Sequence, residues 1–497
     1  MTITAIWAAL PILIPLTSAA VALLLWKRVR VQGLLALVTM LASFGVSLTL
    51  LLHVWQTGAP VTLQSGGWLP PFGIVLVADL PALFFVSMSQ LVLSAGVLYA
   101  LGARDACVQY PPFYPLFLTL AVGLTGSFLT GDLFNLFVFI ELLVISGTAL
   151  TAISDDRYGA EAAYKYFYIS LLASAFLLLA SGSLYVSYGT LNLADLAQRI
   201  AANPDAPLLP AAVALLTATF MVKGAVFPFH FWQPDFHAAA PTPISAMLSS
   251  LVVKTGVYAF FRMTTLLAPE IEFLRTLLVI AGIVGIFYGG FGATGTHHIK
   301  RMLAYSTLSQ IGFILVGIGW GTPAALTAAL VFAFNHALLK AAMLMLAGAV
   351  ASRAAVKGAD FANITGLGKV VPFTGILFLV GSLGLAGIPP MNGFVSKMLL
   401  FRSGFEAEAF ASLAWIGVGS FLTLFYTLRA FQRIWWHAPS SDAQPPKPYG
   451  DRIAAPLLLL TLALAVGMWA EPLLALAQAT ATWMLTPQSY LLAVLGG

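Results

Sequence analysis

The chain has 497 residues, of which 60% are hydrophobic and 8% are charged, whereas soluble globular domains carry roughly 25% charged residues. This composition excludes a water-soluble fold. The apolar stretches recur from end to end, many of them near the roughly 20 residues that a spanning helix needs, and none alternates as an outer-membrane strand does. We therefore predict an all-α polytopic membrane protein.

The first apolar stretch, residues 4–26, is interpreted as a spanning helix. It lacks a positive n-region and is longer than the hydrophobic part of a signal peptide. Hydropathy predicts about fourteen spans in the whole chain. Their centres are expected near residues 15, 43, 88, 120, 142, 175, 220, 254, 282, 311, 337, 387, 420 and 465. The last apolar stretch, 473–494, is too interrupted to be assigned as a further span.

The distribution of positive charge predicts the orientation of these spans. Of the 23 Lys and Arg residues, fifteen lie in connections after odd-numbered spans, four lie after even-numbered spans, and four lie inside spans. Basic residues accumulate in cytoplasmic loops. We therefore expect a protein of the cell (inner) membrane with both termini on the side away from the cytoplasm. The polar loop 439–451 is then cytoplasmic. The net charge of +5 reflects this orientation and does not indicate a nucleic-acid partner.

Several kinds of chemistry are not expected in this chain. Cys107 is the only cysteine, so neither an intrachain disulfide nor a Cys-based iron–sulfur site can form. The spacing of His230 and His237 matches no metal-site signature, and no Gly-rich phosphate loop follows a strand. We expect no cofactor and no metal, and we expect any energy coupling to come from an ion gradient or a partner chain.

Five ionisable residues fall inside predicted spans. A lysine at the centre of a spanning helix costs roughly 2.5–3.5 kcal/mol on insertion scales. One carboxylate could neutralise one lysine and merely join two helices, but it cannot neutralise four. Because desolvation lowers a lysine pKa and a nearby carboxylate raises it, a row of lysines can load and release protons. The five residues are Glu141, Lys223, Lys254, Lys340 and Lys397.

Polar residues near these charges are further candidates: His336 joins the proton-translocating set, and the others are secondary. His336 stands four residues before Lys340 and shares its helical face. His230 lies seven residues after Lys223 and shares that face if the intervening break is mild. Each histidine could instead be a hydrogen-bonded core residue. Three further side chains could carry water between helices or only bond neighbouring helices: Ser306, Ser309 and Gln310.

Two proline interruptions suggest an internal repeat. Pro228 falls in the seventh predicted span, and Pro389 and Pro390 fall in the twelfth. Proline removes a helical hydrogen bond, and paired broken helices in corresponding positions indicate an inverted repeat with an ion site. Ordinary kinking is the alternative. We predict two five-helix units, 106–266 and 267–436, preceded by three helices in 1–105 and followed by a loop, a helix and a tail in 437–497.

The segment 223–262 resembles a known signature. It contains Lys223-Gly224, Pro228, His230 and Trp232, then Pro-Asp-Phe-His-Ala-Ala-Ala-Pro-Thr-Pro, and finally Lys254-Thr-Gly. This pattern is similar to that of the antiporter-like proton-translocating subunits of respiratory complex I, membrane hydrogenases and Mrp-type cation/proton antiporters. Asn-His-Ala before Lys340 and Gly-Ile-Pro-Pro before Lys397 add to the match, which covers about residues 70 to 435.

The resemblance implies fourteen helices with inverted repeats of five and no catalytic chemistry in this chain. It also implies a proton route in which Glu141 and Lys223 form a modulating pair, and Lys254, His336, Lys340 and Lys397 continue toward the exit. Residues 132–141 and 73–79 are similar to the pattern of the D-type subunits of Mrp antiporters. The chain lacks the long lateral helix typical of the distal complex I subunit, and it has lysine at position 397 where one complex I member has glutamate.

These observations leave three hypotheses. In the first, the chain is a proton-translocating subunit of a multisubunit monovalent cation (Na+)/H+ antiporter, with other membrane subunits as partners. In the second, it is a proton-pumping membrane subunit of an NADH-quinone oxidoreductase or a membrane-bound hydrogenase. The third is a structural scaffold, against which the four buried lysines argue. A sodium site needs several converging oxygens, so sodium is left unassigned.

Overall fold

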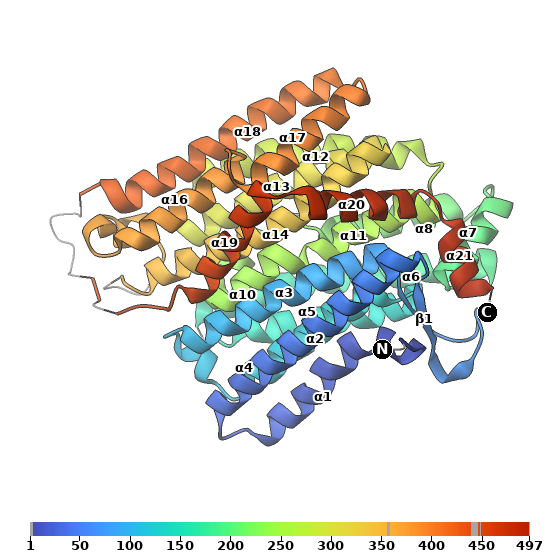
Figure 1. Cartoon of the computed structure of the whole chain (residues 1–497), viewed down its shortest axis with the longest axis horizontal. Helices are drawn as coiled ribbons and strands as arrows, with labels where there is room; N and C mark the ends of the chain where they lie inside the picture. The colour runs from blue at the N-terminus through green and yellow to red at the C-terminus, as the bar shows by residue number, and fades with distance from the viewer. Residues whose placement is uncertain (1–2, 155, 355–357, 439–445, 448, 497) are drawn as a thin grey trace.

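The computed structural model describes residues 3–154, 156–354, 358–438, 446–447 and 449–496, and it is built mainly of helices (Figure 1). Among the described residues, nine helical runs are long and apolar enough to cross a membrane. They are α2 (Val29–Thr57), α3 (Leu80–Gly102), α5 (Leu133–Ala152), α6 (Arg157–Tyr188), the run from α10 to η5 (Thr242–Leu267), α12 (Glu272–Gly295), α13 (Ile299–Trp320), α14 (Pro323–Ala351) and the run from α18 to η7 (Phe410–Trp436). The prediction of a polytopic helical membrane fold is confirmed.

Shorter elements complete the chain. Four apolar helices have fewer than 18 residues: α1 (Leu10–Leu24), α4 (Phe113–Leu129), α8 (Leu209–Lys223) and α16 (Pro372–Ala386). The remaining α-helices are α7 (Leu193–Ala202), α9 (Gln233–Ala239), α15 (Phe361–Ile364), α17 (Asn392–Glu406), α19 (Ala454–Met468), α20 (Glu471–Met484) and α21 (Gln488–Leu495). Short 3-10 turns are η1 (Ala5–Ala8), η2 (Ser65–Gly67), η3 (Ala106–Gln109) and η6 (Leu367–Lys369).

Local sequence explains where many helices begin and end. Side-chain oxygens accept hydrogen bonds from backbone N–H groups in the first turn, at Asp79, Asp132, Asp156, Asn192 and Thr322. Glycines with positive φ end four helices in the left-handed conformation that only glycine adopts without strain; they are Gly58, Gly189, Gly321 and Gly387. The membrane boundaries are therefore encoded by turn residues, not only by hydropathy.

A small antiparallel sheet departs from the all-α expectation. β1 (Val61–Gln64) pairs with β2 (Val75–Ala78), with Val61 opposite Ala78. β2 is fully buried, and β-branched residues such as its two valines favour strands. Hydropathy at this scale cannot separate a short buried strand from a helix, so no pattern in the sequence indicated it.

Both predicted helix breaks are present. The helix carrying Lys223 stops at that residue, and helix resumes only at α9, so Pro228 lies in a nine-residue turn between the two halves. The second break separates α16 from α17 and contains Pro389 and Pro390. A third break was not predicted: α19 and α20 are bent by 81°. The stretch 473–494 is therefore helical, as α20 and α21.

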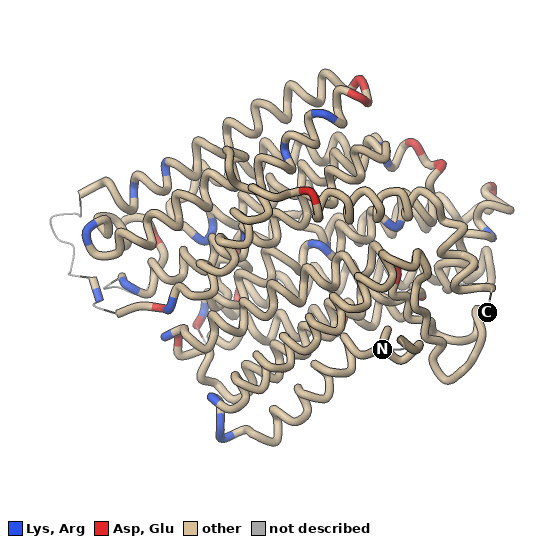
Figure 2. Tube along the Cα trace, viewed as in Figure 1, with Lys and Arg blue, Asp and Glu red and all other residues tan. Residues whose placement is uncertain are grey.

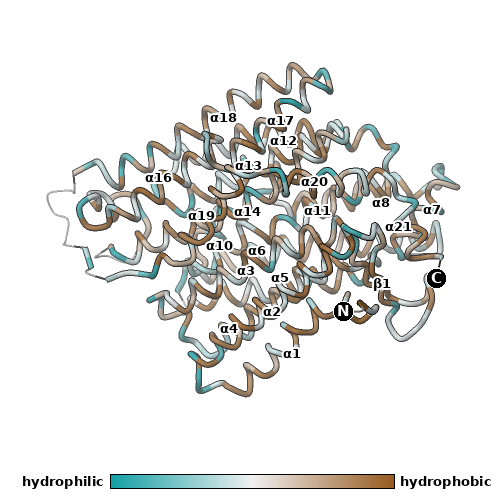
Figure 3. Tube along the Cα trace, in the orientation of Figure 1, coloured by the Kyte–Doolittle hydropathy of each residue, from teal (hydrophilic) through white to brown (hydrophobic). Residues whose placement is uncertain are grey.

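The most buried helices lie at the centre of the molecule. In the most apolar 18-residue stretch of each span, 100% of the residues are buried in the run from α10 to η5 and 94% in each of α13 and α14. In the run from α18 to η7 the share is 33%. α19 and α20 lie against α14 and α3. Figure 3 shows hydrophobic residues along the helices and hydrophilic ones at many of the turns. Lysines in the central helices are therefore shielded from lipid.

The two ends of the molecule differ in charge. Both termini lie toward the end that carries α7, α21 and β1 (Figure 1). Figure 2 shows a cluster of Lys and Arg at the opposite end, near the connection between η7 and α19. The loop predicted to be cytoplasmic, 439–451, lies largely outside the described residues.

Candidate functional site

The first part of the site joins Glu141 on α5 to Lys223 at the end of α8. Ser174 of α6 donates a hydrogen bond to Oε1 of Glu141 or to the carbonyl of Ser170, 2.9 Å away. Lys223 Nζ donates to that same Ser170 carbonyl at 3.3 Å. Among the described residues, no direct ion pair joins Glu141 to Lys223. One turn of α6 therefore stands between the carboxylate and the ammonium.

Glycines bring the next lysine close to the first. A Cβ on Gly256 would lie 2.5 Å from the backbone nitrogen of Gly224 and 2.5 Å from the carbonyl oxygen of Phe220. Real side chains do not tolerate such distances, so α11 (Lys254–Arg262) touches the end of α8 backbone to backbone. Lys223 directly precedes Gly224, and Lys254 lies two residues before Gly256. This contact places the two lysine-bearing segments side by side.

Lys254 is fully buried and bonded to the central helix α14. Its Nζ is 2.9 Å from Nδ1 of His336 and also donates to the carbonyl of Ser250. The preceding turn is the π-helix η4 (Leu248–Val252), and such turns are frequent at functional sites. Among the described residues, His336 Nε2 is buried without a hydrogen-bond partner. The histidine thus contacts Lys254 on one side and has an unbonded nitrogen on the other.

Lys340 is the next buried amine along α14. Its Nζ donates to Oγ of Ser306 at 2.7 Å and to the carbonyl of Leu303 at 3.2 Å. Ser306 is in turn 2.8 Å from the hydroxyl of Tyr426 on α18 (Phe410–Phe431). Ser306 on α13 therefore connects Lys340 of α14 to Tyr426 of α18 by direct hydrogen bonds between neighbouring helices.

The other two polar residues of α13 have different surroundings. Gln310 Nε2 donates to Oγ1 of Thr423 at 3.3 Å, which bonds α13 to α18. The hydroxyl of Ser309 is buried without a hydrogen-bond partner in the described part of the chain. Gln310 also lines a small cavity between His336 and Lys397.

His336 and Lys397 both line that cavity. Its volume is about 10 Å³, close to the minimum that one water molecule needs. Polar residues provide much of its lining: Gln310, Asn335, His336, Ser396 and Lys397. Asn335 and Asn392 exchange hydrogen bonds of 2.8 and 2.9 Å beside it. A water here would have the several polar partners that buried water requires.

Lys397 sits against the second helix break. Its Nζ donates to the carbonyl of Ala386 at 2.8 Å and lies 4.9 Å from the centre of the Phe313 ring. A Cβ on Gly387 would lie 2.6 Å from Cδ of Lys397. The glycine that ends α16 therefore also leaves room for the lysine stem, and the carbonyl freed by the break holds its amine.

His230 lies apart from this row. Because α8 ends at Lys223, the condition of a mild break is not met and no shared helical face forms. The ring stacks on Phe227 at 5.5 Å and packs edge-on against Tyr288 of α12 at 4.4 Å. Its Nδ1 has no hydrogen-bond partner among the residues that the structure describes.

Sequence reasoning assigned no role to His237, which the structure places in the core. The residue is 0% exposed, and neither ring nitrogen has a hydrogen-bond partner within the described chain. A signal was present, because His237 stands inside the 223–262 signature. Its neighbour Asp235 anchors α9 by ion pairs to Lys165 at 3.2 Å and Arg301 at 2.8 Å.

Sequence reasoning also missed a buried ion pair, which lies near the end of the molecule that carries both termini. Asp79 is 0% exposed and accepts hydrogen bonds of 2.7 and 2.6 Å from Arg262. Arg262 Nε donates to the Tyr258 hydroxyl at 2.9 Å, and its guanidinium lies 5.0 Å from the ring centre of Tyr490. The pair ties α3, α11 and α21 together. The two charges stand 183 positions apart, and a pairing over that separation leaves no sequence signal.

Comparison with known proteins accounts for this arrangement. Residues 130–423 match the family described as NADH:quinone oxidoreductase/Mrp antiporter, TM. The chain belongs to this family. The D subunit of the Na(+)/H(+) antiporter of Alkalihalophilus pseudofirmus is 32% identical over 98% of both chains, and that of Bacillus subtilis is 32% identical over the same shares. The resemblance drawn from the sequence is confirmed.

Further relatives include an oxidoreductase subunit and one chain from each of two solved complexes. The N subunit of the NADH-quinone oxidoreductase of Desulforudis audaxviator is 33% identical over 92% of this chain and 94% of its own. A chain of the Mrp complex from Dietzia sp. DQ12-45-1b superimposes with a TM-score of 0.91 at 27% identity over 99% of this chain and 100% of that chain. A chain of the archaeal membrane-bound sulfane sulfur reductase gives 0.90 at 30% identity, covering 98% and 99%. The family therefore shares one fold across complexes of different names.

Proposed function

We propose that this chain is the proton-translocating subunit of a multisubunit Na+/H+ antiporter of the Mrp type in the bacterial cell membrane. One observation carries the proposal: four lysines and a histidine are buried on neighbouring helices, beginning beside Glu141 and ending at Lys397. Whole-length similarity to the D subunits of two Na(+)/H(+) antiporters supports the antiporter branch. Other membrane subunits of that complex are the partners.

The proposed route has two kinds of step. Lys254 and His336 are within hydrogen-bond distance, so a proton can pass between them directly. The step from His336 to Lys397 crosses the cavity that fits one water. Buried ammonium groups repel one another strongly at low dielectric, so loading one amine favours release from the next. The row therefore transmits charge when adjacent sites are occupied alternately.

Glu141 and Lys223 would control loading at the start of this row. The amine is stabilised when the carboxylate is near and charged, and it is destabilised when the carboxylate moves away. Ser174 and the carbonyl of Ser170 stand between them, so a small rotation of α5 against α6 would change the Coulomb attraction. The pair is thus placed to convert a movement into a change of proton affinity.

The test of the antiporter proposal is sodium-dependent proton flux. The complex would be produced in cells that lack other sodium antiporters, and the pH gradient of everted vesicles would be followed after NaCl addition. The proposal expects NaCl to collapse the gradient. A complex that shows no such response and copurifies with flavin and iron–sulfur subunits would instead support the second candidate, the redox-driven pump, which the similarity to an oxidoreductase N subunit favours.

We further propose fourteen spans arranged as two inverted five-helix units, 106–266 and 267–436, with both termini outside the cytoplasm. The pairing of breaks α8/α9 and α16/α17 supports the repeat, and the basic end of Figure 2 supports the orientation. Tyr449 is 67% exposed near that end and Phe72 is 88% exposed near the other. In a Cys107→Ser background, an impermeant thiol reagent outside intact cells should label Phe72→Cys and not Tyr449→Cys. The reverse pattern would overturn the orientation.

A further inference from the structure

A cavity lined by arginines lies at the basic end of the molecule. None of the residues of the amine row lines it. Its volume is about 270 Å³, equivalent to about nine water molecules at 30 Å³ each. Three arginines from three separate elements line it: Arg30 at the start of α2, Arg104 in the loop after α3, and Arg452 before α19. Such a convergence of cations requires an explanation, because like charges repel.

Backbone contacts hold two of these arginines in place. The backbone nitrogen of Arg452 donates to the carbonyl of Gly102 at 3.1 Å, and a Cβ on Gly102 would lie 2.8 Å from Cβ of Arg452. The backbone nitrogen of Arg104 donates to Oδ1 of Asp451 at 2.8 Å. The segment before α19 is thereby fixed to the end of α3, and the two side chains start from fixed points.

Nearby carboxylates do not neutralise the cluster. Asp451 uses one oxygen for Arg104 N and the other for the Tyr99 hydroxyl, 2.6 Å away. Asp105 accepts from the backbone nitrogen of Cys107 at 3.1 Å. Within the part of the chain that the structure describes, the ion pairs within 4.0 Å include none of the three arginines. All three arginines are exposed, and the Arg104 guanidinium lies 5.4 Å from the centre of the Tyr449 ring. They line one open cavity without an acidic partner among the described residues.

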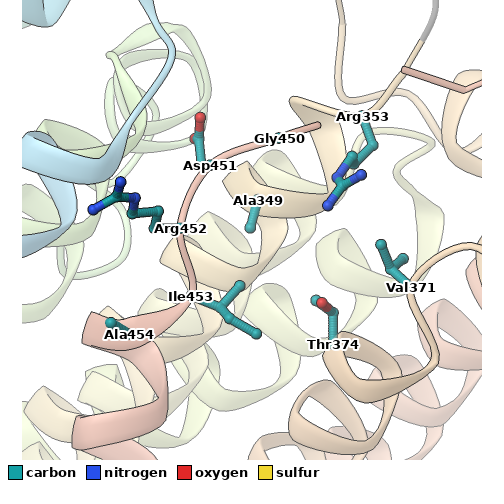
Figure 4. A pocket seen from close by; sticks show the side chains of 9 residues that line it. All are labelled: Ala349, Arg353, Val371, Thr374, Gly450, Asp451, Arg452, Ile453 and Ala454. Atoms are coloured by element: carbon teal, nitrogen blue, oxygen red, sulfur yellow. The ribbon is translucent and has the colours of Figure 1, made fainter. Parts of the chain in front are cut away.

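The cavity is separate from the larger pocket on the other side of the same segment. Figure 4 shows that pocket, where Arg353 points inward between Gly450 and Val371. Arg452 points the opposite way, away from Arg353. Arg452 thus lines both pockets, with its side chain directed away from Arg353.

The surroundings place the cavity at the edge of the bilayer. Leu34 is one helical turn after Arg30, on the same face of α2, and is 58% exposed. Leu24, at the end of α1, is 86% exposed. Trp26 and Tyr110 are exposed nearby, and such aromatic residues concentrate at membrane interfaces. Lipid tails would contact the leucines while a headgroup reaches the arginines.

We propose that this cavity binds the phosphate of an anionic phospholipid in the membrane leaflet at the basic end. Arginine suits this ligand because its planar guanidinium binds phosphate oxygens in pairs. Basic pockets between membrane helices on the cytoplasmic side are known to bind anionic headgroups. The lipid would join α2 and α3 to the segment that leads into α19, and so would fasten the first three helices to the C-terminal helices.

The test measures retained lipid on the purified whole complex. Delipidated complex would be titrated with phosphatidylglycerol in phosphatidylcholine, and bound phosphatidylglycerol would be counted by native mass spectrometry. We expect Arg104→Gln/Arg452→Gln to weaken retention at least about tenfold, because each change removes a guanidinium that can bind phosphate oxygens in pairs. Lys27→Gln/Arg28→Gln removes the same charge from exposed positions at the same end and should leave retention within about twofold of wild type.

Each other result contradicts the proposal. Equal losses in the two double variants would mean bulk attraction to acidic membranes and no specific site. Displacement of the bound lipid by millimolar inorganic phosphate would mean a site for a free anion. Cross-linking of a cysteine at Gln109, which lines the cavity, to an acidic segment of a partner protein, with no lipid retained, would make it a protein interface. Size-exclusion profiles confirm that each variant complex is intact.

Discussion

Replacing Lys397 by arginine separates a titrating role from an anchoring role. Arginine keeps the positive charge and can donate to the Ala386 carbonyl and stack on Phe313, so assembly should survive. The ordinary pKa values are about 10.4 for lysine and about 12.5 to 13.8 for arginine. The deprotonated form is therefore about 100-fold to 2,500-fold rarer in arginine, before any effect of the site.

Antiport should fall by a comparable factor if release from position 397 limits the flux. The assay is NaCl-dependent collapse of the pH gradient in everted vesicles, normalised to assembled complex. Arg402→Lys is the matched control, because Arg402 lies on the same helix, is exposed and pairs with Glu406 at 3.0 Å. It should behave as wild type. Full antiport by an assembled Lys397→Arg complex would refute the reasoning and leave Lys397 as an anchor.

Three further predictions concern stability and pH. Asp79→Asn should lower the stability of the complex by about 3–5 kcal/mol, because it leaves Arg262 buried and unpaired. In thermal melts, Asp79→Asn/Arg262→Met should recover part of that loss. Equal melting temperatures for the wild type and both variants would contradict a structural role for the pair. Gly256→Ala should lower the stability by about 1–3 kcal/mol in thermal melts, because the added Cβ forces α11 away from α8. Gly45→Ala, whose Cβ meets nothing within 4 Å, should leave the stability unchanged. Equal losses of stability in the two variants would show that the close contact is unimportant. Burial, with the charge of Lys300, lowers the pKa of His298 to about 4, so its contribution to stability is complete above pH 6.5 and is lost as the pH falls toward 4. His298→Asn, which keeps a capping side chain for Arg301 N, should weaken the pH dependence of melting between pH 6.5 and 4, and an unchanged dependence would contradict this assignment.

The lysine residues could be predicted from sequence because each violates the composition of its span. Lys254 and Lys340 stand among apolar residues, and the cost of burying an amine identifies them without knowledge of their partners. The helix breaks at Pro228 and Pro389 follow from proline chemistry. Such signals are local, so they remain visible when the fold is unknown.

The partners of these residues could not be predicted in the same way. The contact of Lys254 with His336 spans 82 positions, and that of Arg262 with Asp79 spans 183. His230 was placed on the face of Lys223 on the condition that the break at Pro228 is mild, whereas the turn after Lys223 moves it against Tyr288. The strands β1 and β2 were missed because four residues are too few for a period to be decisive: β1 alternates as Val-Thr-Leu-Gln, and β2 is apolar throughout.

The measurement that tests the central claim most directly is antiport by Glu141→Ala and Lys223→Ala complexes. Both should assemble and lose NaCl-dependent proton flux in everted vesicles, because loading the row requires the titrating amine and its modulating carboxylate. Glu161→Ala and Lys27→Ala, at exposed positions outside the row, should retain flux. Wild-type flux in either assembled core variant would contradict the account.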